Sequence, residues 1–143
     1  SNDTTIFSAN YLETTIQPEM FHILEELSKN KYNKLIIISK AYPTNAKKSK
    51  EILKLYRLEE YFNSIIFCEK NEAKAKIAEA MNVDIMIDDK EEVLKEFPKT
   101  IKTILFKESE APVLLSKLLI ILEIVSGIGF PVHLYMFLTV IFL

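Results

Sequence analysis

The chain has 143 residues, enough for one domain, and its 18 basic and 20 acidic side chains leave a net charge of −2. This balance lacks the basic excess of nucleic-acid-binding proteins, so we predict no nucleic-acid partner. Only two glycines, one cysteine and two histidines are present, which excludes a Walker A loop, a disulfide framework and a Cys/His zinc site.

Charge density divides the chain into two segments. Residues 1–110 carry 17 basic and 19 acidic side chains, whereas residues 111–143 carry only Lys117 and Glu123. We therefore predict a charged core over residues 1–110 and an apolar C-terminal segment over residues 111–143.

The first segment is predicted to alternate helices with short apolar strands. Pro18 suits the first turn of an amphipathic helix, and residues 34–39 (KLIIIS) are typical of a strand buried on both faces. The elements predicted after this strand are a helix over residues 46–58, a strand over 64–68, a helix over 71–81 that Asn71 would cap, a strand over 83–88, a short helix over 91–97 and a strand over 101–106. This alternation predicts βαβ units with a parallel sheet, and therefore an α/β fold.

Polar side chains follow the predicted strands. Ser39 ends the first strand, Lys70 and Lys74 follow the second, and Asp88 and Asp89 end the third. Because α/β sheets bind ligands beyond the carboxyl ends of their strands, we expect these side chains to converge. Carboxylates suit a hard divalent cation, and a hydroxyl and an ammonium suit phosphoryl oxygens.

Each of these residues also has a structural interpretation. Asp89 has the capping-box spacing to cap the following helix, and Ser39 could be a turn hydroxyl. Lys74 lies in a first helical turn, where the helix dipole disfavours a cation, so its position hints at a functional use. Cys68 is expected to be a buried small apolar side chain, and His22 a surface residue.

Residues 18–106 resemble the haloacid dehalogenase (HAD) superfamily of phosphatases. The run ending at Ser39 looks like the second motif of that family, Lys74 or alternatively Lys70 looks like the lysine of the third, and VDIMIDDK from residue 83 resembles the Asp-Asp fourth motif of deoxynucleotidase-like members. The resemblance implies a three-layer Rossmann-like parallel sheet and a Mg²⁺-dependent phosphatase acting on a phosphorylated small molecule. Ser39 and Lys74 would be catalytic, Asp89 would bind Mg²⁺ directly, and Asp88 would bind it indirectly.

The first motif of the family is missing. It is an Asp-x-Asp sequence after a central strand, whose first aspartate attacks phosphorus and whose second transfers protons. The four aspartates of this chain form no Asp-x-Asp, and no apolar strand precedes Asp3. We therefore expect a sheet that is incomplete at its central strand, and very poor phosphatase activity. Two interpretations remain open: a truncated enzyme, or a non-catalytic HAD-like scaffold or binding module.

The C-terminal segment has alternative interpretations. Residues 124–143 carry no formal charge when His133 is neutral, and twenty helical residues span about 30 Å, so they are a candidate membrane span or tail anchor on an otherwise cytoplasmic protein. Alternatively, residues 113–125 could form a covering helix, and residues 137–143 a strand that fills the vacant central position. A segment unrelated to the domain is a third interpretation. A sheet left with exposed edges would be prone to self-association.

Overall fold

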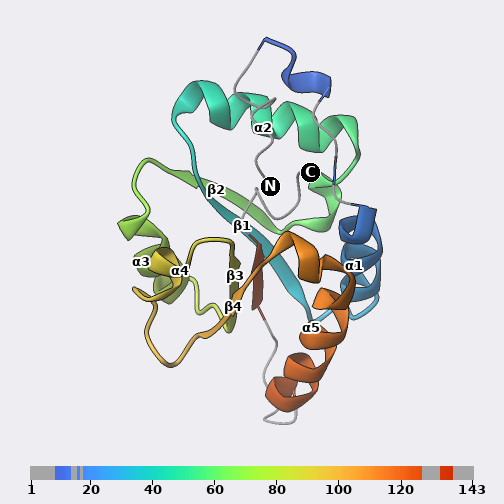
Figure 1. The fold of residues 1–143 in the computed structure, drawn as a ribbon, viewed down its shortest axis with the longest axis vertical. Coiled ribbons are helices and arrows are strands. Elements are labelled where there is room, and N and C mark those ends of the chain that lie inside the picture. Colours follow the sequence, from blue (N-terminus) through green and yellow to red (C-terminus); the bar gives the residue numbers. More distant parts are fainter. Residues whose placement is uncertain (1–8, 14–15, 17, 127–132, 137–143) are drawn as a thin grey trace.

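The computed structural model describes residues 9–13, 16, 18–126 and 133–136 of the chain (Figure 1). In chain order, its elements are the 3-10 helix η2 (Tyr11–Glu13), α1 (Pro18–Ser28), β1 (Lys34–Lys40), α2 (Pro43–Leu55), η3 (Glu59–Tyr61), β2 (Ser64–Cys68), α3 (Glu72–Ala80), β3 (Ile85–Asp88), α4 (Glu91–Leu94), β4 (Lys102–Leu105), η4 (Glu108–Glu110), α5 (Ala111–Ser126) and β5 (His133–Met136). The chain is therefore mixed α/β, and each strand predicted in the first segment is present.

The five strands form one sheet in the order β2-β1-β5-β3-β4, and every neighbouring pair is parallel. The central strand, β5, comes from the far end of the chain. Its Tyr135 is paired with Ile36 of β1 on one side and with Met86 of β3 on the other.

The central position of the sheet, expected from the sequence to be vacant, is therefore filled. The strand in it is His133–Met136. The strand that the sequence suggested over residues 137–143 lies outside the described residues. Filling this position gives the inward edges of β1 and β3 a backbone partner, and edges buried without one would be costly.

Apolar side chains fill both faces of the sheet. Leu35 and Ile37 of β1 belong to one buried cluster, whereas Ile36 and Ile38 belong to the other. This division follows from the two-residue period of a strand and confirms that the apolar run is buried on both faces.

Helices supply the outer walls of both clusters. The first cluster contains buried side chains of α1, α2 and α5, and the second contains buried side chains of α3 and α4. Figure 1 shows α1 and α5 on one side of the strands and α3 and α4 on the other.

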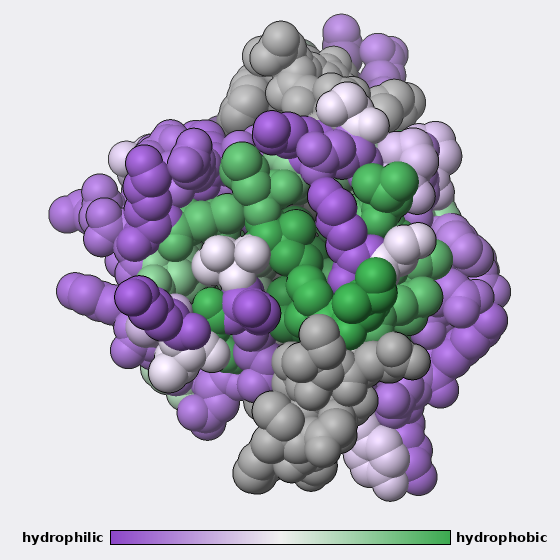
Figure 2. Space-filling view, turned by 60° about the horizontal axis from the view of Figure 1, so that its bottom comes forward, coloured by the Kyte–Doolittle hydropathy of each residue, from purple (hydrophilic) through white to green (hydrophobic). Residues whose placement is uncertain are grey.

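Helix α5 matches the covering helix of the packing alternative. Ala111, Leu114 and Leu118 recur on one side of the helix and are buried in the first cluster. Its other side exposes Leu119 and Ile120. When the bottom of the molecule in Figure 1 is turned toward the reader, a hydrophobic area is visible in the middle of the surface (Figure 2).

None of the described helices is long and apolar enough to cross a membrane. Most of the predicted span over residues 124–143 lies outside the described residues.

Candidate site at the carboxyl ends of the strands

The sequence-predicted residues come from three elements that meet near the carboxyl ends of β1 and β3. Ser39 is the penultimate residue of β1, Asp88 is the last residue of β3, and Lys74 lies in the first turn of α3. All three are buried, with exposed fractions of 3 %, 0 % and 0 %. The alternative lysine, Lys70, is exposed.

The strand register sets the distance across the site. Ile37 of β1 and Ile87 of β3 are both paired with Met136 of β5. Ser39 lies two residues after Ile37 within β1, and Asp89 lies two residues after Ile87, just beyond the end of β3. The two residues therefore follow strands on opposite sides of β5. Two strand spacings amount to about 10 Å, so a ligand would be needed to bridge these residues.

Lys74 and Asp88 form a fully buried ion pair. Lys74 Nζ donates a hydrogen bond to Asp88 Oδ2 at 3.0 Å, and the backbone N–H of Lys90 donates to Asp88 Oδ1 at 3.0 Å. Both oxygens of this carboxylate are therefore engaged by the protein.

Burial and pairing act in opposite directions on these two groups. Burial raises the pKa of Asp88 and lowers the pKa of Lys74, because both charged forms lose hydration. The charge of each partner opposes the pKa shift of the other. The unfavourable place of a lysine at the start of a helix is thus compensated by a carboxylate from β3.

Asp89 does not cap helix α4. The residue at the N-cap of that helix is Lys90, and no side-chain bond closes the cap, so the capping interpretation of Asp89 is wrong. Asp89 Oδ1 is instead buried and has no hydrogen-bond partner among the described residues. An unpartnered buried acceptor costs about 1–3 kcal/mol, which a cation or a ligand donor could recover.

A second orphaned acceptor, which the sequence did not single out for binding, lies at the start of α3. Asn71 is the N-cap residue of that helix, as predicted, but it makes no side-chain cap bond. Within the part of the chain that the structure describes, its Oδ1 atom is buried without a hydrogen-bond partner. The preference of Asn for caps indicated its position but not this open acceptor.

The described side chains offer few ligands for the predicted Mg²⁺. Within residues 9–13, 16, 18–126 and 133–136, no group of three or more His, Cys, Asp or Glu side chains could hold a metal ion. Asp88 is engaged by Lys74 and Lys90, which leaves Asp89 as the carboxylate with an open oxygen. Mg²⁺ is commonly held by one or two carboxylates with water and substrate phosphate oxygens. A phosphorylated ligand would therefore have to complete such a site.

Cys68 borders the site at the end of β2. Its Sγ lies 3.6 Å from the carbonyl oxygen of Ser39 and 3.4 Å from that of Lys70. Burial raises the pKa of the thiol, although the nearby Lys74 acts in the opposite direction. The side chain is half-buried rather than buried as predicted, and it packs against the second cluster like a small apolar residue.

We expect Cys68 to react with iodoacetamide at pH 8 more slowly in the native protein than in the denatured chain. A raised pKa lowers the fraction of thiolate, which is the reactive form. Mass spectrometry can follow the reaction at a single site, because the chain has one cysteine. An equal or faster rate in the native protein would contradict the prediction.

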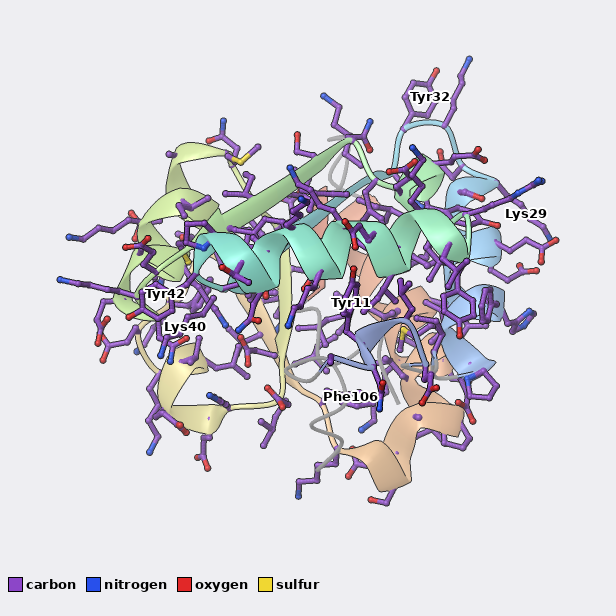
Figure 3. The ribbon with its side chains drawn as sticks, turned by 90° about the horizontal axis from the view of Figure 1, so that it is seen from above. Tyr11, Lys29, Tyr32, Lys40, Tyr42 and Phe106 are labelled. Atoms are coloured by element: carbon purple, nitrogen blue, oxygen red, sulfur yellow. The ribbon has the colours of Figure 1, made fainter. Side chains whose placement is uncertain are left out.

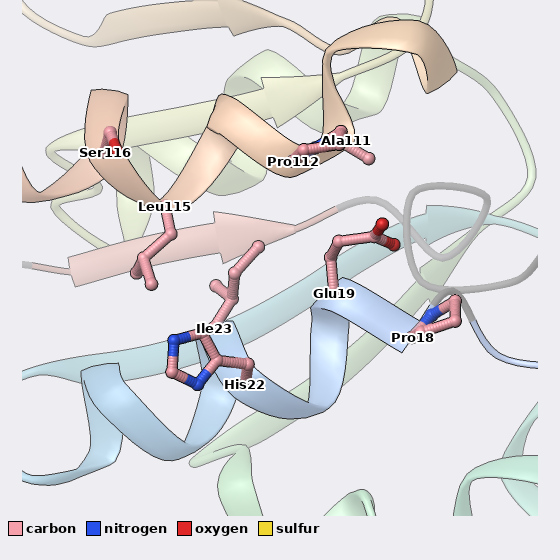
Figure 4. A pocket seen from close by; sticks show the side chains of 8 residues that line it. All are labelled: Pro18, Glu19, His22, Ile23, Ala111, Pro112, Leu115 and Ser116. Atoms are coloured by element: carbon pink, nitrogen blue, oxygen red, sulfur yellow. The ribbon is translucent and has the colours of Figure 1, made fainter.

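A separate pocket lies between α1 and α5 (Figure 4). It has a volume of about 400 Å³ and is lined by Pro18, Glu19, His22, Ile23, Ala111, Pro112, Leu115 and Ser116. Glu19 points toward the first turn of α5. His22 is exposed at the pocket, as predicted for a surface residue. No predicted site residue lines this pocket.

Comparisons with protein-family models, with curated proteins and with solved structures found no match to this chain. Membership of the HAD superfamily therefore stays a prediction, based on the motifs quoted above.

Proposed function

We propose that this chain is a HAD-like α/β domain that binds a phosphorylated small molecule, together with Mg²⁺, at the carboxyl edge of its sheet without hydrolysing it. The observation that carries the proposal is the sequence of the central strand. In the HAD resemblance this strand would lead into the nucleophilic aspartate. Here β5 reads HLYM, and the residues after it read FLTVIFL, without a carboxylate.

The order of the strands supports the HAD-like part of the proposal. The strand that resembles the second motif, β1, and the strand that resembles the fourth, β3, flank the central strand. Ser39, near the end of β1, and Asp89, just after the end of β3, then lie on either side of it. A phosphoryl group between them would accept a hydrogen bond from the Ser39 hydroxyl on one side and contact a cation held by Asp89 on the other.

The buried ion pair of Lys74 and Asp88 determines which charge remains at the carboxyl edge of the sheet. The carboxylate of Asp88 neutralises the ammonium of Lys74, so that Asp89 remains the open anionic group. A bound Mg²⁺ would supply positive charge for the phosphoryl oxygens. We therefore expect Mg²⁺ and the phosphorylated ligand to bind each more tightly in the presence of the other.

A non-catalytic scaffold that binds no ligand is the second candidate function. It is favoured by the complete burial of Lys74 and Asp88, since a satisfied buried pair can serve packing alone. The two candidates differ in phosphate binding.

The protein is expected to bind inorganic phosphate in the presence of Mg²⁺ and to show no Mg²⁺-dependent hydrolysis of an aryl phosphate. Loss of a catalytic nucleophile can lower turnover by about a million-fold, and hydrolysis at that rate is too slow for a standard assay to detect. Isothermal titration calorimetry measures binding, and release of the aryl alcohol measures hydrolysis.

The substitutions Ser39→Ala and Asp89→Asn should each weaken phosphate binding at least tenfold. Glu92→Gln is the matched control, because it removes an exposed carboxylate three residues further along the chain. Absence of phosphate binding in the unmodified protein would favour the second candidate function, a scaffold that binds no ligand. Hydrolysis that Asp89→Asn abolishes would show that the domain is an enzyme and would overturn the proposal.

A further inference from the structure

Helix α2 places a line of lysines on the surface of the molecule. Ile52 and Leu53 bury one side of the helix in the core, and Lys47, Lys50 and Lys54 are exposed. Residues at these spacings share one side of an α-helix and extend along it for about 10 Å. Figure 3 shows α2 lying over the sheet, on the outside of the molecule.

These lysines keep their charge available for a partner. Within the described part of the chain, none of the three makes a salt bridge, and Lys50 Nζ lies 5.8 Å from the ring centroid of Phe67. Two carboxylates lie nearby. Glu51 accepts a hydrogen bond from the hydroxyl of Tyr11, and Glu59 lines the same shallow groove as the lysines.

The groove between these side chains has a volume of about 450 Å³ and also contains Pro43 and Ala46. Large exposed side chains lie at both ends of helix α2. Tyr42, before the helix, is 59 % exposed, and Leu55, at its last residue, is 58 % exposed. Lys40 lies next to Tyr42 at the same end of the helix (Figure 3).

We propose that this lysine face of α2 docks on a membrane surface that contains anionic phospholipids. Lys47, Lys50 and Lys54 would contact headgroup phosphates, and Tyr42 and Leu55 would enter the interfacial region. Lysines beside exposed aromatic and aliphatic side chains are typical of surfaces that lie on lipid headgroups.

The charge of the face determines the expected affinity. Each lysine near an anionic membrane strengthens binding by about fivefold, so three lysines contribute about 100-fold. This attraction weakens with salt, because the Debye length falls from about 30 Å at 0.01 M to about 10 Å at 0.1 M ionic strength. Docking does not depend on the proposed phosphate site.

The test is co-sedimentation of the full chain with vesicles of phosphatidylcholine alone or with 30 % phosphatidylserine. Binding is expected only with phosphatidylserine and should decrease as salt is added. The triple substitution K47Q/K50Q/K54Q should lower the partition coefficient about 100-fold, and Tyr42→Ser with Leu55→Ser should lower it further.

The control variant K76Q/K99Q/K107Q removes the same charge from exposed lysines outside α2. It should change the partition coefficient much less than the α2 variant. An equal loss in the two variants would overturn the assignment to α2. Binding to phosphatidylcholine that is insensitive to salt and to the α2 substitutions would also overturn it, and would indicate the apolar C-terminal segment. Binding to polyglutamate but not to vesicles would overturn the membrane proposal and would indicate that the partner is an acidic polypeptide.

Discussion

Replacing Lys74 by methionine is expected to lower the free energy of unfolding by about 3–5 kcal/mol, because it leaves a buried carboxylate without its cation. Asp88 Oδ2 would lose its hydrogen bond from Lys74 Nζ, at 3.0 Å, in a position with no solvent exposure. Urea unfolding followed by circular dichroism measures the loss. Lys76→Met is the matched control, because Lys76 is exposed on the same helix, and it should change the free energy by less than about 0.5 kcal/mol.

The loss of unfolding free energy in the Lys74→Met variant should be larger at pH 7 than at pH 4. Burial raises the pKa of Asp88 from its usual 3.8, and Lys74 opposes this rise. Without Lys74 the folded-state pKa rises further above the unfolded-state pKa. In this variant the protonated carboxyl group of Asp88 contributes its full stability at pH values below its unfolded-state pKa. That contribution is lost as the pH rises through its folded-state pKa.

A second variant separates the ion pair from packing. Lys74→Met combined with Asp88→Leu removes both charges, so it should be more stable at pH 7 than Lys74→Met alone. A deficit that is the same at both pH values, or a double variant less stable than the single one, would contradict a buried ion pair at this position.

Removing residues 133–143 is expected to abolish cooperative unfolding. Strand β5 pairs with β1 on one side and with β3 on the other, so its loss divides the sheet into the pairs β2-β1 and β3-β4. Two-stranded sheets have marginal stability, and the freed backbone groups would lose their partners. Differential scanning calorimetry should show a single transition for the full chain and none for the shortened one.

Single substitutions test the same strand without shortening the chain. Tyr135→Pro removes a backbone N–H from the central strand and should prevent cooperative folding, whereas Tyr135→Thr keeps that N–H and should still fold. If residues 133–143 were instead a tail anchor separate from the domain, both the shortened chain and Tyr135→Pro would unfold like the unmodified protein.

Much of the site could be predicted because its signals are local. The run that ends at Ser39 predicts a buried strand, and the apolar run that ends at Asp88 predicts another, so their polar ends are placed at one edge of the sheet. The unfavourable position of Lys74 at the start of a helix was also visible in the sequence. Its partner was not, because α3 and β3 had first to be packed together.

The alternation of helices and strands over the first 110 residues was determined by the sequence alone. Helical and strand periodicities are set by neighbouring residues, so a linear sequence reveals them. Only the tertiary structure decided that His133–Met136 lies between β1 and β3, that Asp89 leaves an open acceptor, and that Lys74 is neutralised by Asp88. The physical reason is that these features depend on pairing and burial between segments up to about a hundred residues apart. The local propensity of a segment gives no information about such contacts.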